Sequence, residues 1–297
     1  MYYYGLSINY CIMSMHVINP LFKYGGGNNH VTDFNGVDQY LDLGHATGLE
    51  FTNTQYDTTG VTVTAWVYFD STACYGKPIL TIGRQGTNQY YGMHCKTANT
   101  GKIQMHLMGL NSGVAGAGSN NRRTRVTTTY VVPVTTWTHI AWVFDGGVTS
   151  STAAGWKIFI NGVNQTTTNS GTNTNLTLDY VGDSRIGSDG KASGTIKYYG
   201  PGYLGDITIH QTALPEKAVK AQYDSNNNGI DWRQPTGTTI NDYTAAHAAT
   251  LKAWWRMGSP DGPATYPTIY EEVSMPSGYN GTMTNMSSGD IDPSPLW

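Results

Sequence analysis

Carboxylates are the side chains in this sequence that could do acid–base chemistry, and their spacing is poor for it. Cleavage of a glycosidic bond with retention needs two carboxylates about 5–5.5 Å apart. On a strand, this requires positions i and i+2 or i+4 on one face. The glutamates are Glu50, Glu216, Glu271 and Glu272. Glu216 begins a predicted helix, and the adjacent Glu271 and Glu272 would point to opposite faces of a strand. Asp38 and Asp42 are four residues apart, but we expect Asp38 to order the turn NGVD. We therefore expect no enzymatic activity.

Nucleophile and metal motifs are also missing from the sequence. It contains neither GxSxG nor HExxH, and its eight histidines show no ligand spacing. His139 lies inside the apolar segment WTHIAWVF, so we expect a hydrogen-bonded core histidine there rather than a catalytic base.

One segment has part of the pattern of a calcium-binding loop. In DSNNNGID, Asp224, Asn226 and Asn228 occupy loop positions one, three and five, and a glycine follows at position six. Pro235 stands at position twelve, where a glutamate normally closes the loop, although Asp231 could close a shorter site. An ordinary turn after a helix has the same composition, so calcium is one of two interpretations.

Aromatic side chains offer a binding chemistry, because the apolar face of a sugar ring stacks on them while polar groups hold its hydroxyls. The glycine-rich loop YYGPGY supplies the candidates Tyr198, Tyr199 and Tyr203, and Tyr90 and Tyr91 form a second group. These tyrosines could instead pack between loops or against another subunit, where tyrosine is also common.

The composition predicts a β protein. Only 12% of the residues are charged, about half the usual share, and the abundant Thr, Asn, Gly and Tyr favour strands and tight turns.

The net charge is −3, and the one dense basic group, Arg122, Arg123 and Arg125, is expected in a solvated loop, so we expect no nucleic acid partner. No apolar run reaches the roughly 18 residues of a membrane span, so we expect no membrane partner. Cys74 and Cys95 are expected as free buried thiols, with a bridge between neighbouring strands as the alternative.

Short strands at intervals of roughly ten residues must position these candidates. VTVTAWVYF (61–69) alternates strictly, so Val61 and its alternate neighbours should face a core. The segment 137–147 is apolar on both faces, which fits a central strand with one face on the core and the other covered. Asn161-Gly162 predicts a two-residue hairpin. Residues 215–223 predict a helix with Pro215 in its first turn, and residues 251–258 predict a strand, with a short helix as the alternative.

Five segments in this order, FNGVDQYLDLG, VTVTAWVYF, WTHIAWVFDG, KIFINGV and GYLGDITIHQTALPEKAVKAQY, together resemble the laminin-G-like, concanavalin A-like lectin/glucanase superfamily. The resemblance implies an all-β fold, a two-sheet antiparallel jelly-roll sandwich over residues 31–223, in which GYLGDI returns beside the first strand. An N-terminal arm (1–30) would precede the sandwich, and a C-terminal extension (224–297) would pack on or beside it. The resemblance also implies calcium at the rim of the sandwich, where Asp183 and Asp189 are candidates.

The segments LKAWWRMGSPDGPATYPTIYEEV and NGTMTNMSSGDI resemble the tail of laminin-G-like proteins encoded by marine tailed phages. This resemblance implies a non-catalytic protein on the virion surface, a capsid decoration or a tail or fibre component, that adheres to glycans. Its partners would be other virion proteins, further copies of itself in a homo-oligomer, and cell-surface glycans. The alternatives are a free lectin or adhesin, extracellular or on a cell surface, and, less favoured, a glycoside hydrolase.

Overall fold

The computed structural model describes residues 31–46, 48–49, 60–83, 92–108, 110–111, 122–145, 155–170, 176–177, 183–189, 198–225, 231–233, 242–257, 266–273 and 278–292. These residues form two large antiparallel sheets that pack face to face. The predicted all-β jelly-roll sandwich is therefore confirmed. The segment predicted as an N-terminal arm lies outside the described residues.

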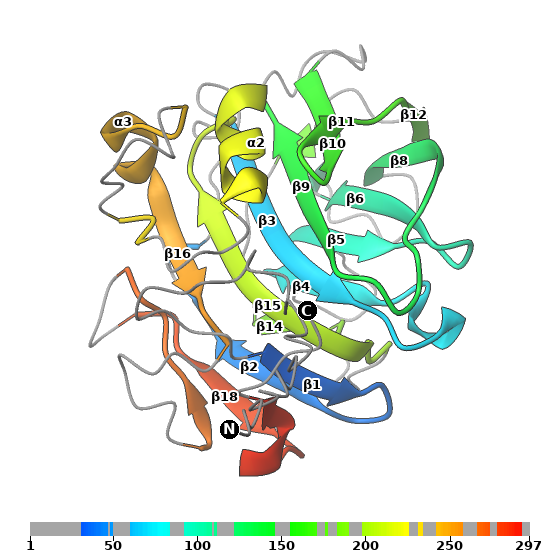
Figure 1. Cartoon of the computed structure of the whole chain (residues 1–297), viewed down its shortest axis with the longest axis vertical. Helices are drawn as coiled ribbons and strands as arrows, with labels where there is room; N and C mark the ends of the chain where they lie inside the picture. The colour runs from blue at the N-terminus through cyan, green and yellow to red at the C-terminus, as the bar shows by residue number, and fades with distance from the viewer. Residues whose placement is uncertain are drawn as a thin grey trace, which may run out of the picture.

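The eight-stranded sheet faces the viewer in Figure 1. Its strands follow the order β11 (Val163–Asn164), β10 (Trp156–Ile160), β9 (Thr138–Phe144), β3 (Val61–Tyr68), β15 (Pro201–His210), β1 (Val31–Asn35) and β19 (Ile291–Asp292), and β16 (Leu251–Trp255) also pairs with β15. Since β15 pairs with β1, the segment GYLGDI does return beside the first strand. The strand predicted at residues 251–258 is confirmed as β16.

The nine-stranded sheet lies behind the first sheet in Figure 1. Its order is β12 (Thr167–Ser170), β8 (Arg122–Val131), β6 (Lys102–Met108), β5 (Gly92–Thr97), β4 (Pro78–Ile82), β14 (Ser184–Ile186), β2 (Tyr40–Gly44), β18 (Gly281–Thr284) and β17 (Thr268–Ile269). The smaller elements are the strand pair β7 (Leu110–Asn111) and β13 (Leu176–Thr177), the helices α2 (Glu216–Asp224) and α3 (Ala245–Ala248), and the short 3-10 helices at Thr72–Cys74 and Ser288–Asp290. No helix among the described residues is long and apolar enough to cross a membrane.

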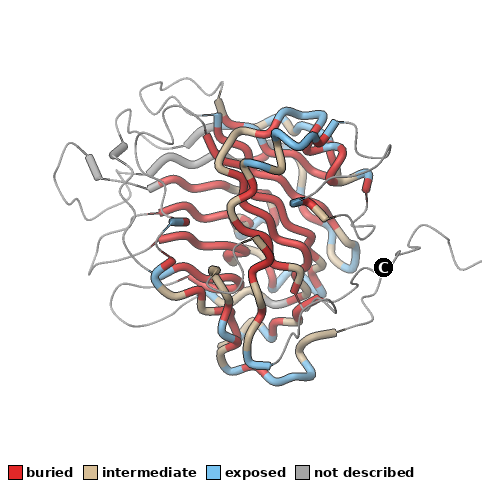
Figure 2. Tube along the Cα trace, turned by 90° about the vertical axis from the view of Figure 1, so that its left-hand side faces the viewer, coloured by how far each residue is buried: buried red, intermediate tan, exposed pale blue. Residues whose placement is uncertain are grey.

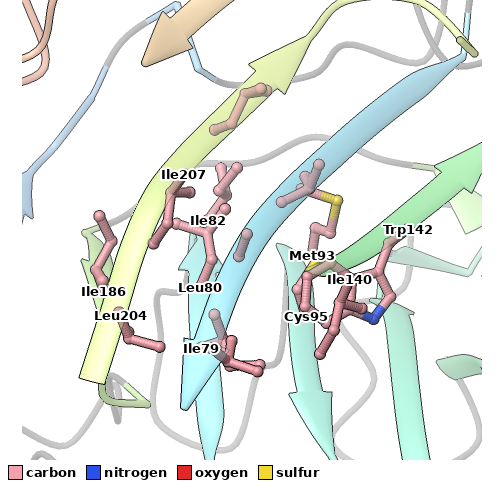
Figure 3. Close-up of a cluster of buried hydrophobic side chains, with 14 of the residues drawn as sticks. Ile79, Leu80, Ile82, Met93, Cys95, Ile140, Trp142, Ile186, Leu204 and Ile207 are labelled. Atoms are coloured by element: carbon pink, nitrogen blue, oxygen red, sulfur yellow. The ribbon is translucent and has the colours of Figure 1, made fainter. Parts of the chain in front are cut away.

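The main core lies between the two sheets. Val61, Val63 and their alternate neighbours on β3 point into it, as the sequence predicts. Figure 3 shows Ile140 and Trp142 of β9 beside Met93 of β5, which belongs to the opposite sheet. The Trp142 indole N–H also donates to the main-chain carbonyl of Gln104, at 2.9 Å. Burial of a large apolar side chain contributes about 1.5–3 kcal/mol, so the strand that carries Trp142 holds the two sheets together.

The outer face of the eight-stranded sheet is partly covered by α2, which lies across it in Figure 1. Ala141 and Val143 of β9 form a second buried cluster there with Ala218 and Val219 of α2. The prediction of a central strand that is covered on both faces is therefore confirmed. Figure 2 shows that, among the described residues, buried positions run along the strands and most exposed positions lie in the connections.

Local predictions at the turns and caps had mixed outcomes. Asn161 and Gly162 have φ of 48° and 74°, which confirms the hairpin between β10 and β11. The placement of Pro215 in the first turn of α2 is wrong. Its backbone is extended, with ψ of 155°, and the helix begins at the next residue, so Pro215 is the N-cap. Cys74 and Cys95 are free and buried, as expected.

The basic segment forms a strand, so the prediction of a loop there is wrong. Arg122–Val131 is β8, which pairs with β6 and β12. The arginines are followed by threonines, valines and a tyrosine, and these β-branched and aromatic residues favour a pleated strand. The β propensity of these residues therefore outweighs the preference of charged residues for a solvated loop.

The C-terminal segment is tied to the sandwich at a buried carboxylate. Asp206, on β15, has a left-handed φ of 45° and accepts hydrogen bonds from the indole N–H groups of Trp254 on β16 and Trp232. Burial raises the pKa of Asp206, although the hydrogen bond from Trp254 acts in the opposite direction. Two tryptophans from beyond α2 therefore depend on one acid of the sandwich for their hydrogen bonds.

Candidate functional site

A row of polar side chains crosses the outer face of the nine-stranded sheet. Strand pairing places Arg185 opposite Thr81, Thr81 opposite His94, and His94 opposite His106. We call these four residues the polar row. Asp42 pairs with Arg185 on its other side. The members of the row are only 0–8% exposed, although their neighbours along each strand already fill the core. A sheet face that buries four polar side chains must satisfy their donors and acceptors there.

The histidine end of the polar row combines donors and acceptors. The rings of His94 and His106 are stacked, with centroids 6.4 Å apart and an interplanar angle of 10°. His106 Nε2 lies 3.2 Å from Gln104 Oε1, and His94 Nε2 lies 3.9 Å from Asp189 Oδ1. Imidazole, amide and carboxylate groups together can both donate to and accept from hydroxyl groups.

The arginine end of the polar row carries aromatic rings. The Arg185 guanidinium lies 5.7 Å from the centre of the Tyr40 ring, and the Tyr40 and Tyr199 rings are 6.2 Å apart. Arg185 Nη2 donates to Asp183 Oδ2 at 3.0 Å. The face therefore combines a charged donor with two rings that could contact the apolar side of a ligand.

The YYGPGY loop divides its tyrosines between the two sheets. Tyr199 reaches the polar row through Tyr40, and Tyr198 is 55% exposed with Lys77 Nζ 6.0 Å from the centre of its ring. Tyr203 belongs to β15 and lies in the other sheet. The three residues do not form one binding platform. Tyr90 and Tyr91 lie outside the described residues.

Tyr203 is one member of an aromatic row on the outer face of the eight-stranded sheet. Its ring is 5.7 Å from Tyr68, which is 5.6 Å from Trp137. Asp33 pairs with Tyr203 at the end of this row. Burial raises the pKa of Asp33, and the negative charge of Asp70 raises it further. The rings are tilted or edge-on to one another, so they mainly pack against each other.

His139 also lies on the outer face of the eight-stranded sheet. It is buried there beneath other side chains, so the prediction of a buried histidine is confirmed. The ring packs against Trp66 and Tyr223, and burial lowers the pKa of His139 to about 3. The prediction that it is hydrogen-bonded is wrong for Nδ1, which has no hydrogen-bond partner among the described residues. Its neighbours there are aromatic rings, and a ring face offers an N–H or lone pair no strong partner.

The carboxylates of the possible calcium loop each bind a cation of the chain. Asp224 accepts from Lys220 Nζ at 2.7 Å, one turn earlier in α2. Asp231 accepts from Arg233 Nε at 2.8 Å. Burial alone would raise the pKa of Asp231, but the hydrogen bonds from the Arg233 side chain and backbone, together with the positive charges of Arg233 and Arg256, outweigh burial and lower the pKa. Asn226 and Asn228 lie outside the described residues, and within the described ranges no three His, Cys, Asp or Glu side chains are grouped to hold a metal ion. The calcium prediction stays untested.

Glu271 and Glu272 have structural contacts. Glu271 Oε1 accepts main-chain hydrogen bonds from Trp254 at 3.0 Å and Val273 at 2.6 Å, and Glu272 lies 3.6 Å from Arg233. Asp38 accepts from the Asn35 amide at 2.9 Å, which confirms its role in the NGVD turn. None of these carboxylates belongs to the polar row.

Sequence reasoning named none of the four residues of the polar row, only some of the residues beside it. It named Tyr199, Asp183 and Asp189 for other reasons, but neither His94 nor His106. A signal was present, because each histidine stands between two apolar residues of a short strand, in MHC and MHL. Alternation then places it on the face opposite the core. What the sequence lacks is the pairing register that puts the two histidines side by side.

Comparison with known proteins gives one family and several distant structures. A family model described as the concanavalin A-like lectin/glucanases superfamily matches residues 35–220. No curated protein sequence matches the chain. A Bacteroides ovatus protein described provisionally as carbohydrate binding is 13% identical, with a TM-score of 0.48. The match covers 88% of this chain but only 59% of that protein.

Two further solved structures are similar over a smaller part of the chain. The CBM40 of a Ruminococcus gnavus IT-sialidase, bound to alpha2,3 sialyllactose, is 16% identical with a TM-score of 0.44, over 63% of this chain and 96% of that one. A heptameric SAP-like pentraxin from Limulus polyphemus is 17% identical with a TM-score of 0.43, over 70% and 89% of the two chains.

Proposed function

Because this chain belongs to the concanavalin A-like lectin/glucanases superfamily, we propose that it is a non-catalytic carbohydrate-binding protein whose polar row contacts the sugar. The superfamily name covers binding and cleaving proteins, so the choice between them rests on the residues of this chain. The observation that carries the proposal is the polar row itself, four buried polar side chains on a sheet face that is not needed for the core.

The composition of this face fits a sugar. Gln104, Asp189 and the two histidines supply donors and acceptors in a fixed arrangement, which suits the hydroxyl groups of a pyranose. Tyr40 and Tyr199 supply the ring surface that the apolar side of a sugar would contact. Sites of this kind join an apolar platform to a few well-placed polar groups.

The experiment is a binding titration against a broad panel of oligosaccharides, followed by variants on both faces. Tyr199→Ala and His106→Ala should each weaken binding by about fivefold to tenfold, since each removes one contact of roughly 1 kcal/mol. Tyr203→Ala is the matched control, because it removes a tyrosine of the same loop region from the opposite sheet. Equal losses in Tyr199→Ala and Tyr203→Ala would refute the assignment of this face.

Support for a non-catalytic role comes from the carboxylates. Asp183 is bound to Arg185, and Asp42 Oδ1 accepts from the main-chain N–H of Gly44 at 2.9 Å. A retaining glycosidase would need one of them free as a nucleophile and the other as a proton donor. A reducing-end assay on every oligosaccharide that binds should show no products. Turnover that is lost in Asp42→Asn or Asp183→Asn would refute the non-catalytic proposal.

The finer proposal is that the protein is displayed on the surface of a tailed phage particle. Its support is the likeness of the C-terminal segments to the tails of phage-encoded laminin-G-like proteins. Peptide mass spectrometry across a density gradient of the source material tests it. We expect many copies to sediment with intact particles, whereas recovery only in the soluble or cell-wall fraction would favour a free lectin or adhesin.

A further inference from the structure

The guanidinium of Arg185 has a buried N–H group that lacks a hydrogen-bond acceptor. Arg185 is only 8% exposed, yet its Nε has no hydrogen-bond partner among the described residues. Its one hydrogen bond there is from Nη2 to Asp183. A buried donor without a partner costs about 1–3 kcal/mol, and more when it is charged. Such a cost in a native protein indicates that something outside the chain supplies the acceptor.

A second unpaired donor lies three residues further along the chain. Ser188 is fully buried, and its Oγ also has no partner in the described part of the structure. The main-chain carbonyl of Ser188 accepts from Thr81 Oγ1 at 3.1 Å, which fixes this turn beside the polar row. Two buried groups in the segment 185–188 that are able to donate a hydrogen bond therefore have no partner.

The carboxylates on this face, in contrast, all have partners within the protein. Asp183 accepts from Arg185, Asp42 accepts from the Gly44 N–H, and Asp189 lies beside His94. The Arg185 Nε–H, which can only donate, lacks an acceptor, and the Ser188 hydroxyl is able to donate to the same acceptor. An acceptor that carries negative charge makes hydrogen bonds to arginine about twice as strong as a neutral one does.

We propose that Arg185 recognises an acidic group of the sugar, either a carboxylate or a sulfate. The proposal rests on the carbohydrate-binding function above and names its ligand class. Asp183 has a side chain that is 53% exposed, so the guanidinium is one side chain away from solvent on that side. An arriving oxyanion would take the free Nε–H, while the Tyr40 ring holds the guanidinium from its flat side.

The test compares ligands that differ only in charge. Oligogalacturonide is titrated against its methyl ester, and a sulfated galactan oligosaccharide against its desulfated form, beside a panel of neutral oligosaccharides. We expect at least one acidic form to bind about tenfold tighter than its neutral twin, and the pair that shows this distinguishes carboxylate from sulfate. Arg185→Met should abolish the preference. Arg233→Met is the matched control, because Arg233 is also paired with an aspartate but packs over the Trp254 ring, on the other sheet.

Each outcome decides the proposal. Equal binding of acidic and neutral twins refutes the acidic-group assignment and leaves the carbohydrate-binding function in place. A folded Arg185→Met variant, checked by its circular dichroism and Tm, that keeps the preference refutes the role of Arg185. If that variant does not fold, the comparison of each acidic oligosaccharide with its neutral form in the wild-type protein still decides the proposal. No binding to any oligosaccharide refutes both the inference and the proposed function.

Discussion

His139 should make the protein sensitive to mild acid. Its folded pKa is about 3, because burial disfavours the charged imidazolium, against an ordinary value of 6.5. As the pH falls below 6.5 the unfolded chain takes up a proton at this residue and the folded chain does not. The contribution of His139 to stability is therefore fully present above pH 6.5 and is lost progressively between pH 6.5 and about 3.

The size of the effect follows from the same two pKa values. At pH 5 nearly every unfolded molecule carries the proton, and the free energy of unfolding falls by about 2 kcal/mol for this one histidine. His139→Phe removes the titrating group and keeps an aromatic ring between Trp66 and Tyr223. The variant should therefore lose about 2 kcal/mol less than the wild type between pH 7.5 and pH 5.

The assay is urea unfolding of both proteins at pH 7.5 and pH 5, monitored by tryptophan fluorescence. His210 is also buried with a pKa of about 3, but it is present in both proteins and cancels in the comparison. The same substitution at the exposed His45 is the control for the exchange of histidine for phenylalanine itself. Identical pH dependence in wild type and His139→Phe would show that His139 becomes protonated inside the folded protein, and the reasoning from burial would be wrong.

Three further predictions concern a buried carboxylate, a hairpin turn and the possible calcium loop. Asp206→Ala leaves the indole N–H groups of Trp232 and Trp254 without acceptors, so we expect the free energy of unfolding to fall by about 2–4 kcal/mol in urea titrations; a loss below 0.5 kcal/mol would mean that water replaces the carboxylate. Gly162→Ala forces an alanine to φ of +74°, which should cost about 1–2 kcal/mol and lower the Tm by several degrees; an unchanged Tm would contradict the turn geometry. Removal of calcium with EDTA should leave the Tm unchanged, because the Asp224 carboxylate is already bound to a lysine; a clear drop in Tm would support the calcium interpretation.

The sequence predicts the individual strands of this protein better than it predicts which strands pair and in which register. The alternation in residues 61–69 and the apolar faces of residues 137–144 follow from side-chain geometry within one strand, and both are confirmed. Asn161-Gly162 also acts locally, through the backbone preferences of two residues. These features need no information about what lies beside them.

The binding face depends on such information, and the sequence predicts only pieces of it. His94 and His106 become neighbours because β5 and β6 pair in one particular register. Tyr199 and Tyr203 are close in the sequence, but the chain enters β15 between them, so they reach different sheets. Spacing along the chain therefore gave a false impression of one tyrosine cluster.

The pairing of the first and last strands has a consequence for how the chain is made. Val31 of β1 pairs with Asp292 of β19, and Leu41 of β2 pairs with Met283 of β18. At ordinary synthesis rates of 5–20 residues per second, β1 leaves the ribosome roughly 10–50 s before its last partner does. Until β14 and β15 have been made, Phe34 and Leu41, which are buried in the finished sandwich, are exposed to solvent on strands that still lack a partner. Slow elongation or a chaperone that covers this segment should therefore decide how much of the protein folds correctly in the cell.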